Sequence, residues 1–141
     1  FYEVFMPMAS RSGEIKTLFS QSIIFIKKAG IFIFVGNFLL MWLLFKLYGN
    51  GFFFDYRLGI LIAISATIYS FNPILASLIQ SLGISGIRFG AFVAFISALL
   101  NVGFNFLLIP RFGLFGAVIA TIIASLWAIS FASWWLLRII R

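Results

Sequence analysis

The sequence predicts an all-α membrane protein with four transmembrane helices preceded by an amphipathic interfacial helix. Of its 141 residues, 64% are hydrophobic and 9% are charged, and the mean hydropathy is +1.20. A small water-soluble domain cannot bury that much apolar surface, because a large share of its surface stays exposed. The charged residues also leave four uncharged stretches that are long enough to cross a bilayer.

Residues 1–28 come before the first long apolar stretch and are more polar. Between Ser12 and Lys28, one helix face collects Ile15, Leu18, Phe19, Ser22, Ile23 and Ile26. Ser12 suits the N-cap of such a helix, and Glu14 suits its first turn. Two arrangements agree with this pattern: a helix lying along the cytoplasmic side of the membrane, or a cytoplasmic extension of the first span.

The four apolar stretches predict a transmembrane bundle over residues 29–141, with helices at about 29–47, 58–82, 89–109 and 114–137. Lysine or arginine brackets each stretch, so that the charged groups reach the headgroup regions. Gly83 stops the second helix, and Pro110 with Gly113 makes a sharp turn between the third and the fourth. The fourth ends in Trp134 and Trp135, as expected at a membrane interface.

The basic residues predict the orientation of these helices. When the connecting segments are assigned to alternate sides, seven of the ten lysines and arginines fall on one side. The positive-inside rule places that side, with the carboxyl terminus, in the cytoplasm. The net charge of +7 therefore indicates orientation and attraction to membrane lipids, and we expect no nucleic-acid partner.

Residues that carry chemistry are scarce. The chain has no cysteine and no histidine, which excludes disulfides, thiol nucleophiles, histidine catalysis and nearly all transition-metal sites. The acidic residues Glu3, Glu14 and Asp55 are too scattered to form a carboxylate pair, and no nucleophile or phosphate-binding motif is present. We expect neither an enzyme nor a bound metal or cofactor.

Neutral polar residues inside the predicted spans are the candidate functional residues. Ser97, Asn101 and Asn105 form a line on one face of the third helix, and an unpaired amide in hydrocarbon costs several kcal/mol. The line predicts either interhelical hydrogen bonds or a wet substrate pathway. Asn72 and Gln80 of the second helix are further candidates for lining a pathway.

Two further patterns concern the shape of the helices. Pro73 predicts a kink near the middle of the second span, which is either static or part of a cavity that changes shape. The fourth helix carries a small residue at every fourth position, which predicts a close helix-packing seam: Gly116, Ala120, Ala124, Ala128 and Ala132.

Residues 101–121, NVGFNFLLIPRFGLFGAVIAT, carry a family resemblance. The segment has asparagines in a penultimate span, then Leu-Ile-Pro, an aromatic residue and Gly113, and then Gly116-Ala117 before Ile119-Ala120-Thr121. It resembles the signature of the O-antigen type of oligosaccharide flippases, which are polysaccharide biosynthesis proteins in the multidrug/oligosaccharidyl-lipid/polysaccharide exporter superfamily. The segments FMPMAS and LIQSLGISGIRFGAF are weaker matches, so the resemblance covers nearly the whole chain.

The resemblance implies that this chain is the carboxyl-terminal part of a larger two-bundle exporter, with residues 1–28 including the end of a preceding helix. It implies alternating access that moves an undecaprenyl-diphosphate-linked oligosaccharide across a bacterial or archaeal cytoplasmic membrane. The implied partners are this substrate, membrane lipids and the missing amino-terminal half. The alternatives are a drug or cation antiporter of the same superfamily and a non-transporting scaffold bundle.

Overall fold

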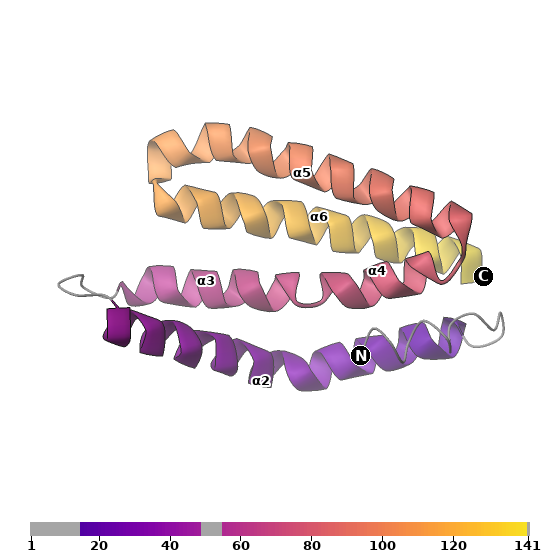
Figure 1. Cartoon of the computed structure of the whole chain (residues 1–141), viewed down its shortest axis with the longest axis horizontal. Coiled ribbons are helices and arrows are strands. Elements are labelled where there is room, and N and C mark those ends of the chain that lie inside the picture. Colours follow the sequence, from indigo (N-terminus) through magenta and orange to yellow (C-terminus); the bar gives the residue numbers. More distant parts are fainter. Residues whose placement is uncertain (1–14, 49–54, 141) are drawn as a thin grey trace.

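The computed structural model describes residues 15–48 and 55–140, and within them it has helices and turns but no strand (Figure 1). Four helical stretches are long and apolar enough to cross a membrane: Lys28–Leu47, Tyr56–Gln80, Ile84–Phe112 and Leu114–Ile139. The chain is therefore an all-α protein with the character of a multi-pass membrane protein. Ser12, Glu14 and the FMPMAS segment lie outside the described residues.

The first helix, α2, runs without interruption over Ile15–Tyr48. Its 34 residues give a length of about 51 Å, well above the roughly 30 Å of a hydrocarbon core. Of the two expected arrangements, the structure has the extension of the first span, and no separate helix ends at residue 28. Leu18, Phe19 and Ser22 are buried, because this part of α2 packs against other helices.

The second span is divided into α3, Tyr56–Tyr69, and α4, Asn72–Gln80. The span predicted at about residues 58–82 lies at Tyr56–Gln80, and its helix is interrupted near the middle. Pro73 lies in the first turn of α4, where its missing N–H is tolerated, but that proline has no proton to donate to the carbonyl of Tyr69. The expected kink is thus a break at Ser70 and Phe71.

The last two helices, α5 over Ile84–Phe112 and α6 over Leu114–Ile140, form a hairpin. Both exceed the predicted bounds, and Pro110 lies inside the last turn of α5 rather than beyond its end. The turn consists of Gly113, whose φ of 56° lies in the region that favours glycine. Gly83, with φ of 78°, makes the corresponding turn before α5.

Figure 1 shows α6 in the middle of the arrangement, with α5 on one side, α3 and α4 on the other, and α2 outside them. Successive spans alternate in direction, so Arg88 and Arg138 lie at one end of the bundle and Arg57 and Arg111 at the other. We refer to these as the Arg88 end and the Arg111 end. This distribution of the arginines agrees with the orientation prediction, in which the connecting segments are assigned to alternate sides of the membrane.

The main buried cluster lies at the Arg88 end and joins α2, α4 and α6. Its members are all apolar: Leu18, Phe19, Leu75, Leu78, Ile79, Ala132 and Leu136. Leu78 and Leu136 are fully buried. The amphipathic face that the sequence predicts before the first span therefore packs partly into the bundle.

Two glycines permit close backbone approach. A Cβ at Gly86 would overlap the carbonyl of Ile79, and a Cβ at Gly116 would lie 2.9 Å from the amide nitrogen of Ile109 and overlap the Leu108 carbonyl. These contacts fix how α4 meets α5 and how α5 meets α6.

Candidate functional site

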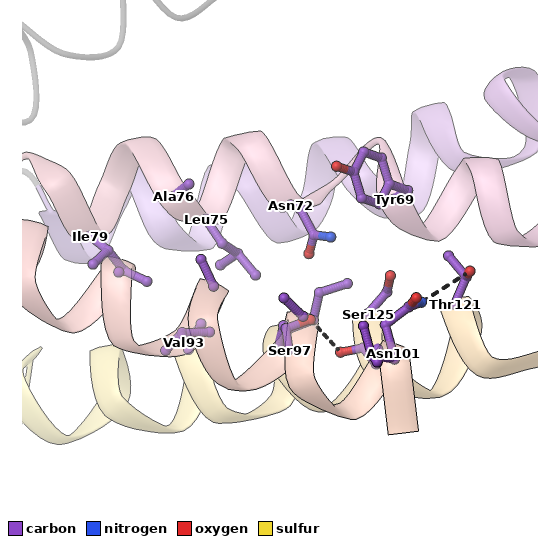
Figure 2. A pocket seen from close by; sticks show the side chains of 18 residues that line it. Tyr69, Asn72, Leu75, Ala76, Ile79, Val93, Ser97, Asn101, Thr121 and Ser125 are labelled. Atoms are coloured by element: carbon purple, nitrogen blue, oxygen red, sulfur yellow. Dashed lines mark hydrogen bonds between the residues drawn. The ribbon is translucent and has the colours of Figure 1, made fainter. Parts of the chain in front are cut away.

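A cavity of about 480 Å³ lies between α3 and α4 on one side and α5 on the other, with α6 beneath it (Figure 2). It extends from Tyr69 and Asn72, at the helix break, to Ile79 on α4. We call this cavity the groove. It exists because α5 packs along α6 and on α4, but has no comparable contact with α3.

Small residues form much of the groove, since they leave space between the helices that carry them. Gly90, Ala94 and Ala98 come from α5, and three members of the predicted seam come from α6: Ala124, Ala128 and Ala132. The other two members, Gly116 and Ala120, are buried and do not line the groove. The row of small residues on α6 thus packs closely toward the Arg111 end and lines the groove toward the Arg88 end.

Two polar groups face the groove without a hydrogen-bond partner in the described part of the chain. Figure 2 shows the Asn72 amide on α4 and the Ser125 hydroxyl on α6 pointing toward one another. Neither side chain makes a hydrogen bond among the described residues, although Ser125 is only 5% exposed. Free donors and acceptors in an apolar surround bind water or the polar groups of a ligand.

The polar line on α5 is bonded to α6 and also lines the groove. Ser97 Oγ donates to the carbonyl of Ala124 at 3.2 Å, and Asn101 Nδ2 donates to Thr121 Oγ1, also at 3.2 Å. Thr121 Oγ1 in turn donates to the carbonyl of Ala117 at 3.0 Å. The interhelical hydrogen bonds expected as one alternative are therefore present, on two residues that also contact the cavity.

Asn105 and Gln80 lie away from the groove. Asn105 Nδ2 donates to Asn101 Oδ1 at 2.8 Å, and Asn105 contacts a second hollow of about 360 Å³ beside Phe106 and Pro110. The Asn105 Oδ1 atom is buried and accepts no hydrogen bond in the described part of the chain. Of the five candidate residues, the structure brings Asn72, Ser97 and Asn101 together.

Tyr69, Thr121 and Ser125 line the groove but were not among the predicted pathway residues. Thr121 and Ser125 lie beside the small-residue row of α6, which was the available signal. A second interhelical pair was also missed: Asn37 Nδ2 on α2 donates to Thr67 Oγ1 on α3 at 3.5 Å. Single polar residues without a periodic pattern do not predict such pairs.

The groove is electrically neutral. All of its lining side chains are apolar or uncharged, and the described residues contain no group of three metal-ligating side chains. The arrangement therefore offers hydrogen-bonding groups and space but no charged group. Such a lining suits the binding or passage of a ligand with apolar and hydrogen-bonding parts.

Comparisons with known proteins leave the family of the chain open. No family model, no curated protein and no solved structure matches it. The groove, the helix break and the hydrogen bonds around them are therefore the grounds on which a function rests.

Proposed function

We propose that the chain is part of a membrane transporter and that the groove lines the route of a lipid-linked oligosaccharide across a cytoplasmic membrane. The substrate in this proposal is an undecaprenyl-diphosphate-linked repeat unit used for cell-surface polysaccharide. The observation that carries the proposal is the groove itself, in which Asn72 and Ser125 present free polar groups within apolar spans.

The chemistry of the groove supports an amphipathic substrate. Its walls are mostly small and apolar, which suits hydrocarbon, whereas its amide and hydroxyl groups suit the hydroxyls of a sugar. The break at Ser70 and Phe71 adjoins the groove, and interrupted helices of this kind line cavities that change shape in transporters. The residues that carry the family resemblance, 101–121, form the end of α5, the Gly113 turn and the start of α6.

The other half of such a transporter would supply the second bundle and the coupling. No carboxylate lines the groove in the described part of the chain, so nothing in it favours the drug or cation antiporter. A scaffold bundle is the second candidate function, and the hydrogen bonds from Ser97 and Asn101 to α6 favour it, because polar pairs also hold helices together in lipid.

Filling the groove tests the proposal. Ala128→Phe places a ring in the groove, and Ile123→Phe is the matched control on the exposed side of the same helix. In cells that depend on the complete protein for surface polysaccharide, we expect Ala128→Phe to abolish polysaccharide export and Ile123→Phe to preserve it, at equal membrane abundance. Full export by both variants would contradict the proposal.

A second measurement does not depend on the folding of a bulky variant. The chain has no cysteine, so single cysteines report accessibility without background. We expect a water-soluble thiol reagent to label Asn72→Cys and Ser125→Cys but not Phe106→Cys, which is 78% exposed and does not line the groove. If neither groove position is labelled and Asn101→Ala weakens helix association without reducing export, the scaffold function replaces transport.

A further inference from the structure

An aromatic patch joins α5 to α6 near the Arg88 end, outside the groove. It consists of Phe89, Phe92, Trp127, Phe131, Trp134 and Trp135. Phe131 is its centre, with ring centroids 5.3 Å from Trp127, 5.7 Å from Trp134 and 5.6 Å from Phe89. Phe89 also stacks on Trp135 at 4.0 Å, so the two helices are held in register at this point.

Two arginines stand at the outer end of this patch. The Arg138 guanidinium lies over the Trp134 ring, 4.8 Å from its centroid. Arg88 precedes Phe92 by four residues on α5, a spacing that places neighbouring side chains on one helix face. Trp134 and Phe92 both contact Phe131. Arg138 therefore adjoins the patch at Trp134, and Arg88 adjoins it at Phe92.

The positive charge at this end has no counter-ion in the described part of the chain. Asp55 is the one acidic residue there, and it caps α3 at the Arg111 end. Arg88 and Arg138 are exposed, and a guanidinium stacked on a ring keeps N–H donors for a second partner. The first turn of α5 has no side-chain cap. The positive end of the α5 dipole lies near Arg88 and adds to the positive charge there.

The dimensions match one leaflet of a bilayer. From Trp127 to Arg138 the chain advances eleven residues along α6, or about 16 Å, close to half of a hydrocarbon core of roughly 30 Å. Phe92 and Trp134 remain 52% and 49% exposed, which leaves the patch open to a ligand.

We propose that the aromatic patch and its two arginines bind one anionic phospholipid of the adjoining leaflet. Its acyl chain lies along Phe131 toward Trp127, and its phosphate accepts hydrogen bonds from Arg88 and Arg138. This site is separate from the groove and does not rest on the proposed transport function.

Quenching of tryptophan fluorescence by brominated lipid tests the site. The Trp42→Phe chain, reconstituted in phosphatidylcholine vesicles, leaves three tryptophans, all of them in the patch. We expect brominated phosphatidylglycerol to quench them several-fold more effectively than brominated phosphatidylcholine at the same mole fraction. Replacing both Arg88 and Arg138 by glutamine should abolish that preference, because each arginine near an anionic surface contributes about fivefold to lipid affinity.

The matched control removes two arginines from the opposite end, as Arg57→Gln with Arg111→Gln, and should keep the preference for phosphatidylglycerol. Arg88→Lys with Arg138→Lys retains the charge and should keep part of it. Equal quenching by the two brominated lipids, or equal losses in the two glutamine pairs, would overturn the proposal. Displacement of the brominated phosphatidylglycerol by soluble inorganic phosphate would show a general anion site instead of a lipid site, and would also overturn it.

Discussion

The side-chain amide of Asn101 donates a hydrogen bond to the Thr121 hydroxyl at 3.2 Å, and this bond joins α5 to α6 beside the groove. The same arrangement occurs between α2 and α3, where Asn37 donates to Thr67. In both pairs the threonine hydroxyl donates to the carbonyl four residues earlier, Ala117 or Ala63, which leaves its oxygen free to accept. Each helical hairpin is thus joined by an asparagine on its first helix and a threonine on its second.

The Asn101–Thr121 pair should contribute measurably to stability. A double-mutant cycle with Asn101→Ala and Thr121→Val is expected to give a coupling free energy of about 0.6–1.7 kcal/mol, from the average to the maximum found for such pairs in lipid. The corresponding cycle with Asn37 and Thr67 should give less, since that pair is separated by 3.5 Å. Reversible unfolding in mixed micelles measures both, and a coupling of zero at Asn101 and Thr121 would contradict the hydrogen bond.

The two close-approach glycines should not tolerate a methyl group. Gly86→Ala and Gly116→Ala force backbone apart at the α4–α5 and α5–α6 contacts, and overpacking of this kind costs about 1–3 kcal/mol. Gly103→Ala is the matched control on α5, because no side chain or backbone of another helix lies within 4 Å of its Cβ position. The midpoint of thermal unfolding should fall for the first two variants only. A control that falls equally would show a general effect of removing glycine.

Leu78 is expected to dominate the buried cluster at the Arg88 end. Truncation to alanine removes a fully buried side chain, which costs about 2–5 kcal/mol. Leu99→Ala removes the same atoms from a position that is 54% exposed, and should cost much less. Denaturant titration of the two variants in one detergent gives the comparison, and equal losses would show that Leu78 is not buried in the folded protein.

Pro73→Ala should join α3 to α4. An alanine N–H at position 73 can bond to the Tyr69 carbonyl, so the helix gains a hydrogen bond across the present break. Continuing the helix would also turn Asn72 relative to the groove. We therefore expect slower amide hydrogen exchange at residues 70–74 and weaker thiol labelling of Asn72→Cys in the Pro73→Ala chain. Unchanged exchange would mean that Phe71, not the proline, sets the break.

The helical spans were predictable because charge and apolarity are local properties of the sequence. The four described spans overlap the four predicted ones, and Gly113 is the turn that the sequence indicates. The boundaries were less predictable. Pro110 lies inside the last turn of α5 rather than beyond it. The first helix, α2, continues through Lys28, whose long side chain can reach the headgroups without ending the helix.

The groove was only partly predictable, since it depends on how helices pack and not on any one of them. The line of Ser97 and Asn101 indicated a polar face, and the structure places both residues in the groove. Gln80 shares the polar character of that line but lies at the end of α4, outside the groove. The sequence did not indicate which helix packs opposite the polar face of α5. That depends on the contact between α4 and α5 at Gly86, and hydrophobic periodicity does not report contacts between separate segments.

Because of the buried cluster at the Arg88 end, we expect the two ends of the bundle to differ in how their stability depends on temperature and urea. It joins Leu18 and Phe19, which precede the first apolar span, to Leu136 near the end of the last one. Separating Leu18 and Phe19 from this cluster exposes apolar surface to water and carries a positive heat capacity, whereas separating helices within the bilayer replaces protein contacts by lipid contacts. We therefore expect urea and cooling to weaken the contacts of Leu18 and Phe19 more than the α5–α6 crossing at Gly116.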